Sequence, residues 1–141
     1  MKRLNKIVLF ITVVIFMLPM TACAQRVKFL SSAVVPAANG VVKVKKDSNK
    51  NYQIKVLINN LAEPQRLTPP REMYLVWMVT ENNQPQNLGK IEATTTFMSS
   101  KLKASFQSVS SAKPTKIYIT AENDPTIQYT YSETILTTSN F

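Results

Sequence analysis

The feature of the sequence that most limits its fold is an alternation of apolar and polar residues with a period of two, which recurs after residue 25. It is clearest over residues 41–46 and 52–61. Successive side chains of a β-strand point to opposite faces of the sheet, so this pattern predicts strands with one buried and one solvated face. No apolar stripe with helical spacing follows residue 25, and we therefore expect an all-β domain.

Turn signals divide the chain into short extended segments. Asn, Asp and Pro supply most of these signals, because the 141 residues include only 2 glycines. Asn39-Gly40 is expected to be a turn, and the stretches at 94–100 and 108–111, rich in serine and threonine, are expected to be loops. Extended segments are expected at 27–35, 41–46, 52–61, 73–79, 87–93, 102–106, 115–121 and 127–138. Seven or eight short strands with this spacing predict a single small β-sandwich over residues 24–141, immunoglobulin-like in its general architecture.

One segment, Met73–Val79, is apolar at every position. Such a run is typical of a central strand that is covered on both faces. Trp77, near its middle, is expected to be a core residue rather than part of an aromatic ligand platform with Tyr74. Three later aromatic residues are candidates for a partly exposed binding face: Tyr118, Tyr129 and Tyr131.

A hairpin that turns at residues 47–51 is expected to carry a basic outer face. The register follows if the apolar residues of both strands lie on the core side. Val44 then pairs with Ile54 and Val42 with Val56 on that side. On the outer side, Lys45 pairs with Gln53 and Lys43 with Lys55. Like charges directly opposite one another destabilise a strand pair. Lys43, Lys45 and Lys55 are therefore interpreted either as a merely solvated face or as a contact for an anionic lipid headgroup or acidic partner.

The first 23 residues have the three parts of a signal peptide. A positively charged start is followed by an apolar run at 7–18, and then by Pro19 and small residues. A membrane span needs about 20 apolar residues, so we expect cleavage rather than a permanent anchor.

Two cleavage sites remain open. The sequence Met20-Thr21-Ala22-Cys23 is similar to a lipobox, in which Cys23 becomes lipid-modified and forms the new N-terminus. Ala22-Cys23-Ala24 also fits an ordinary signal peptidase site, which would leave Gln25 first. The protein is therefore expected to be exported, either as a membrane-anchored lipoprotein, which the position of the only cysteine favours, or as a soluble periplasmic protein.

The composition argues against catalysis. With no histidine and 1 cysteine, the chain cannot form a histidine-based catalytic triad, a Cys/His metal site or an internal disulfide. Glu122 and Asp124 are close in sequence but lie beside a proline turn, and the other acids are scattered. No serine has the sequence context that activates it in hydrolases, and no glycine-rich phosphate loop is present. We expect no enzyme activity, no cofactor and no metal.

The charge favours anionic partners. Removing the signal peptide takes away 3 of the 17 basic residues, which leaves 14 against 8 acidic residues and a net charge of about +6. The expected partner is an envelope protein or an anionic surface, with the membrane reached through a lipid if Cys23 is modified. No nucleic acid is expected.

Three motifs occur at Tyr74-Leu75-Val76-Trp77, at Asn87-Leu88-Gly89 and at 117–122 (Ile-Tyr-Ile-Thr-Ala-Glu). In these motifs the chain resembles the extracytoplasmic C-terminal domain of anti-sigma-K factors, over about residues 73–138. The resemblance implies a β-sandwich outside the cytoplasm. The chain has no room for that family's cytoplasmic domain, and Asn123-Asp124-Pro125 stands where the family has glycine, so sigma-factor binding is not carried over.

Together these features predict a non-catalytic, exported cell-envelope module that binds or senses a protein or a surface component. The alternative is an accessory regulatory protein related to the outer domain of membrane-bound anti-sigma factors.

Overall fold

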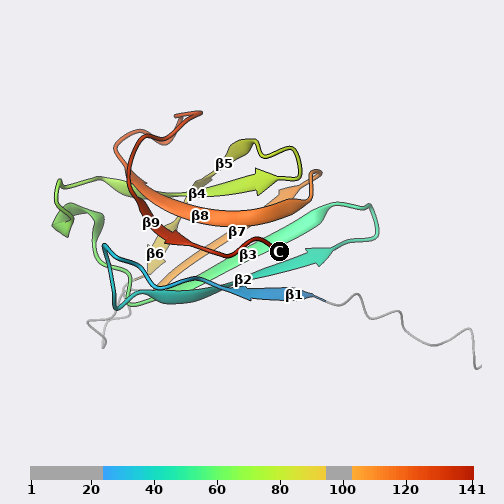
Figure 1. Ribbon diagram of the computed structural model, residues 1–141, viewed down its shortest axis with the longest axis horizontal. Helices are drawn as coiled ribbons and strands as arrows, with labels where there is room; N and C mark the ends of the chain where they lie inside the picture. The colour runs from blue at the N-terminus through green and yellow to red at the C-terminus, as the bar shows by residue number, and fades with distance from the viewer. Residues whose placement is uncertain (1–23, 95–102) are drawn as a thin grey trace, which may run out of the picture.

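The protein is a sandwich of two antiparallel β-sheets (Figure 1). The computed structural model describes residues 24–94 and 103–141. One sheet has the strand order β1-β2-β3-β7-β6 and the other has the order β5-β4-β8-β9. The strands are β1 (Gln25–Lys28), β2 (Asn39–Lys46), β3 (Tyr52–Asn59), β4 (Met73–Thr80), β5 (Pro85–Lys90), β6 (Glu92–Thr94), β7 (Lys103–Ser110), β8 (Pro114–Glu122) and β9 (Thr134–Thr137). The all-β sandwich expected from the alternation is confirmed.

The β2–β3 hairpin has the register that the sequence predicts. Val42 pairs with Val56 and Val44 with Ile54 on the core side, while Lys43 pairs with Lys55 and Lys45 with Gln53 on the outer side. The turn between the strands is held by the Asp47 carboxylate, which accepts hydrogen bonds from the amides of Asn49 and Asn51, each 2.9 Å long. Since a shift by one residue would exchange the two faces, the apolar pattern and this turn together fix the register.

The strand β4 lies inside the four-stranded sheet, between β5 and β8, as its apolar sequence predicts. Its side chains from Tyr74 to Met78 are all buried. The side chains that alternate toward the five-stranded sheet (Tyr74, Val76 and Met78) belong to the main core. Leu75 and Trp77 point to the other face of the sheet and are equally inaccessible to solvent, so this sheet is covered on both sides.

The main core fills the space between the two sheets. Tyr74 lies within it, and its hydroxyl donates a 2.9 Å hydrogen bond to the carbonyl of Ala62. Most other large buried side chains of this core come from β2, β3, β4, β8 and β9: Val42, Val44, Ile54, Val56, Ile58, Val76, Met78, Ile117, Ile119, Ile135 and Leu136. Val35, Leu61 and Ile91 join them from the connections between strands. Aliphatic strand residues therefore supply most of the apolar surface that stabilises the fold.

The segment 87–93, expected to be one strand, is divided between the two sheets. β5 pairs with β4, whereas β6 pairs with β7 in the opposite sheet. Ile91 forms the step between them: its side chain is buried in the core and its amide donates a 3.0 Å bond to the carbonyl of Tyr74. Gly89, with φ of 125°, adopts a conformation just before this step that other residues rarely accept.

Four local expectations were wrong. Asn39-Gly40 begins β2 instead of forming a turn, and Ser108 and Ser110 belong to β7 instead of a loop. The first strand ends at Lys28, and its continuation turns where the Ser32 hydroxyl accepts a 2.9 Å bond from the Val35 amide. The final strand occupies only Thr134–Thr137, because most of the segment before it is a connection over the sheet.

Some expectations concern residues outside the described part of the chain. These are the signal peptide at 1–23 with Cys23, the serine- and threonine-rich stretch at 95–100, and Leu102. Among the described residues, no helix has both the length and the apolar character that crossing a membrane requires.

Candidate functional site

The outer face of the five-stranded sheet is basic over four of its strands. Arg26 on β1 pairs with Lys43 on β2, and Lys43 pairs with Lys55 on β3, so three cations stand side by side in one row across the sheet. The remaining cations of this face lie on β1, β2 and β7. We call the complete set the basic face: Arg26, Lys28, Lys43, Lys45, Lys55 and Lys103.

The cations of the basic face have no carboxylate partner within the described residues. The ion pairs in this part of the chain are Lys113 with Glu81, at 3.0 Å, and Arg66 with Glu63, at 3.8 Å, and both lie elsewhere. All eight acidic residues of the protein belong to the described part. Glu92, opposite Ser105 on the edge strand β6, is the carboxylate that this face itself carries. The face therefore presents a nearly uniform positive charge to solvent.

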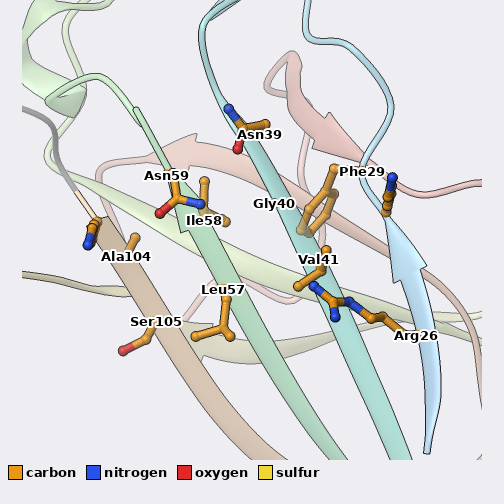
Figure 2. Close-up of a pocket in the computed structure, with 12 residues that line it drawn as sticks. Arg26, Phe29, Asn39, Gly40, Val41, Leu57, Ile58, Asn59, Ala104 and Ser105 are labelled. Carbon is orange, nitrogen blue, oxygen red and sulfur yellow. The ribbon is translucent and has the colours of Figure 1, made fainter.

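Within the basic face lies a hollow of about 720 Å³ (Figure 2). Its walls come from β1, β2, β3 and β7. Val41 on β2 and Leu57 on β3 are paired directly and supply an apolar floor. Figure 2 shows the Arg26 side chain reaching from β1 across β2 beside Val41. The hollow thus combines cationic rims with an apolar floor.

The sequence pattern predicts three residues of the basic face, Lys43, Lys45 and Lys55, and the structure brings these three together. The other three, Arg26, Lys28 and Lys103, were not predicted. Arg26 and Lys28 flank the apolar Val27, and this short alternation is the sequence pattern that indicates strand β1. Only the pairing of β1 with β2, which the sequence left open, shows that this short strand extends the basic face.

The expected aromatic face is not a single surface. The Tyr118 ring stacks on Trp77, with centroids 6.0 Å apart and planes inclined by 7°. Burial is the main cause that raises the pKa of Tyr118, and the nearby Glu122 carboxylate adds to it. Tyr129 and Tyr131 instead extend from the connection between β8 and β9, where they are 72% and 101% exposed.

Trp77 is buried, as expected, but it lies outside the main core. It is on the outer face of the four-stranded sheet, where its indole nitrogen donates a 2.9 Å bond to the Thr120 hydroxyl. In Figure 1 the connection between β8 and β9 lies on the side of this sheet away from the five-stranded sheet. We call this connection, residues 123–133, the covering loop.

Polar contacts hold the covering loop against the sheet. The Glu122 carboxylate accepts hydrogen bonds from the hydroxyls of Thr130 and of Ser132, the latter at 2.8 Å. The side-chain amide of Asn87 on β5 donates to the carbonyls of Pro125, at 3.0 Å, and Ile127, at 2.9 Å. Glu122 and Asn87 therefore hold the loop in place over Trp77 and Tyr118.

Glu122 and Asp124, the two acids that are close together in the sequence, both have structural contacts. Glu122 binds the covering loop, and Asp124 accepts bonds from the amide and hydroxyl of Thr126, which lower the pKa of the Asp124 carboxyl. Over residues 24–94 and 103–141, no three residues of the types that bind metals gather into a group.

Comparisons with protein-family models, with curated proteins and with solved structures found no match to this chain.

Proposed function

We propose that this protein is a non-catalytic, exported cell-envelope module that binds an anionic surface through its basic face. The observation that carries the proposal is the row of Arg26, Lys43 and Lys55, three neighbouring cations on adjacent strands without a carboxylate beside them. Like charges in directly opposed positions repel each other and destabilise the sheet. An anionic partner that lies over the row removes this repulsion.

The shape of the basic face favours an extended partner. Adjacent strands are about 4.8 Å apart, so the cations form a lattice over several strand spacings rather than a single point site. Membrane surfaces with anionic lipids attract such clusters, by about 1 kcal/mol for each Lys or Arg close to the surface. A layer of anionic headgroups therefore fits the face better than one small anion.

The strand that follows the proposed lipid anchor in the sequence belongs to this same face. β1 begins at Gln25, two positions after Cys23, and it is the edge strand that carries Arg26 and Lys28. Cleavage before Cys23 with lipid attachment would bring the basic face close to the headgroups. A single lipid chain binds membranes weakly, and a basic patch strengthens such binding. N-terminal mass analysis of the protein from its host distinguishes a lipidated Cys23 from Gln25, and an intact Met1 would contradict export with cleavage.

The central test is vesicle binding by the soluble protein that starts at Ala24. We expect it to sediment with vesicles containing phosphatidylglycerol at low salt, to dissociate as salt rises, and not to bind pure phosphatidylcholine vesicles. The variant K43Q/K45Q/K55Q should lose at least tenfold in affinity.

The matched control is K50Q/K113Q/K116Q, which removes the same charge at the β2–β3 turn, at the turn before β8 and on β8 in the other sheet. It should bind as the parent does. Circular dichroism and urea unfolding verify that both variants fold. Equal binding by the two variants would show that only net charge matters, and would reject the basic face as the contact.

A further inference from the structure

The hollow in the basic face differs from the rest of that face by its apolar floor. Val41 and Leu57 are directly opposed, half-buried and outward-facing. The row to which they belong continues from Lys28 on one side to Ser105 and Glu92 on the other. Two aliphatic side chains in the middle of a charged surface leave a patch that water solvates poorly.

Cations flank this floor on opposite sides. Arg26 and Lys28 stand on β1, and Lys103 stands on β7, three strand spacings away, or about 14 Å between backbones. The Arg26 side chain lies across β2 toward the floor (Figure 2). The guanidinium group presents a fork of N–H donors that matches two phosphate oxygens, whereas a lysine acts as a point charge.

We propose that this hollow binds a phosphate-bearing amphiphile with a net negative charge, with its phosphate held by Arg26 and Lys28 and its apolar part lying on Val41 and Leu57. This inference deepens the proposed function and rests on it, because it names the class of anion that the basic face selects. A bare anion uses the cations and leaves the floor in water, and an uncharged apolar ligand leaves the cations unused. A ligand that has both groups next to each other satisfies the two sides of the hollow at once.

The source of the phosphate is distinguished with four water-soluble probes. Dihexanoyl phosphatidylglycerol, below the concentration at which it forms micelles, has both groups. Glycerophosphoglycerol has the phosphodiester alone, and inorganic phosphate is the free anion. Dihexanoyl phosphatidylcholine has the same chains and a phosphodiester, but its choline group cancels the charge, so it should bind more weakly than dihexanoyl phosphatidylglycerol. Amide chemical shifts of the soluble protein locate each probe, and their saturation gives its Kd.

We expect dihexanoyl phosphatidylglycerol to shift the amides of the hollow on β2, β3 and β7, around Val41, Leu57 and Ser105. Glycerophosphoglycerol should bind at the same place about tenfold more weakly, which corresponds to about 1.4 kcal/mol. Inorganic phosphate should bind more weakly still. Shifts that map elsewhere, or equal affinity for inorganic phosphate, would overturn the proposal in favour of a general anion contact.

Two variants separate the floor from the cations. V41T/L57T keeps residues that suit strands but makes the floor polar. It should reduce the affinity for the short-chain lipid to that of glycerophosphoglycerol and leave the affinity for glycerophosphoglycerol unchanged. R26Q/K28Q should weaken both ligands about tenfold or more, whereas K116Q, on the other sheet, should weaken neither. Unchanged lipid affinity in V41T/L57T would show that the floor takes no part, and V41T alone provides the same comparison if the double variant does not fold.

The vesicle test and the probe test can fail separately. Vesicle binding that depends on Lys43, Lys45 and Lys55, without saturable binding of the short-chain lipid in the hollow, would reject this inference and keep the proposed function. Binding of the short-chain lipid in the hollow without vesicle binding would reject the proposed contact with anionic surfaces and keep the hollow as a lipid-binding site.

Discussion

The indole nitrogen of Trp77 and the hydroxyl of Thr120 are joined by a 2.9 Å hydrogen bond between neighbouring strands, on the sheet face that looks away from the main core. Both residues are completely buried, on the face to which Glu122 and Asn87 bind the covering loop. Replacing Thr120 by Val keeps the side-chain shape and removes the acceptor. A buried donor left without a partner costs about 1–3 kcal/mol, so we expect T120V to lower the free energy of unfolding by that amount.

Urea unfolding followed by Trp77 fluorescence measures this change. The control is Thr120→Ser, which keeps the hydroxyl and should lose less stability than T120V. Native emission typical of an indole in water would contradict the burial of Trp77. Equal losses in the two variants would contradict the role of the hydrogen bond.

A second prediction concerns the carboxylate that holds the covering loop. Glu122 accepts bonds from Thr130 and Ser132, so E122A should release the part of the loop that carries Tyr129 and Tyr131. Chymotrypsin cleaves after tyrosine, and we expect E122A to be cut at these two positions at least several times faster than the parent. Glu133→Ala, which removes an exposed carboxylate of the same loop, is the control and should be cut at the parent rate. Equal rates for E122A and the parent would mean that Glu122 does not restrain the loop.

The third prediction concerns Gly40, where the backbones of β2 and β3 pack closely. A Cβ atom at this position would lie 2.4 Å from the Leu57 carbonyl oxygen and 3.1 Å from the Ile58 Cα, both on the neighbouring strand. Because backbone atoms must move to relieve this overlap, G40A should lose about 1–3 kcal/mol of stability in urea unfolding. Ser105→Ala, on an exposed position of the same sheet, should change stability by less than about 0.5 kcal/mol. A G40A protein as stable as the parent would contradict the close approach of β2 and β3.

The fourth prediction is an alkaline transition that depends on Tyr74. Burial raises the pKa of Tyr74 to about 12, from an ordinary value of 10.0. The folded state thus disfavours the ionised phenol, and the stability linked to Tyr74 is complete below pH 10 and is lost as pH rises from 10 toward 12. Absorbance of tyrosinate should show Tyr74 ionising near pH 12 instead of near pH 10.

Tyr74→Phe supplies the control for this transition. It removes the hydrogen bond to Ala62, which should lower stability at pH 7 by about 0.5–1.5 kcal/mol. It should also make the free energy of unfolding less dependent on pH between 10 and 12. A pH dependence identical to that of the parent would assign the alkaline transition to other groups.

The parts of the fold that the sequence predicted correctly are those that local pattern determines. In the β2–β3 hairpin, alternation defines the buried face and the Asp47 turn defines the register, so the opposition of Lys43 and Lys55 follows from nearby residues alone. The central position of β4 follows in the same way from its apolar residues on both faces.

The parts that the sequence did not predict depend on contacts between distant segments. The residues around Trp77 indicate that something covers its face, but not that the covering segment is 123–133. Ile91 looks like one more strand position, although there the chain passes from one sheet to the other. The basic face was only half identified for the same reason, because Arg26 joins it through a strand pairing that a four-residue segment with weak alternation does not specify.

The separation of charge between the two outer faces has a consequence for how the molecule approaches a surface. Six cations and one carboxylate, Glu92, lie on the outer face of the five-stranded sheet. On the opposite side, Glu122, Asp124 and Glu133 lie in or under the covering loop, and they outnumber Lys116 on β8. The protein therefore has an electric dipole across the thickness of the sandwich. Near a negatively charged surface, this dipole experiences a torque that turns the five-stranded sheet toward the surface. The torque acts over about 10 Å at 0.1 M salt, so it favours an approach in which the basic face leads.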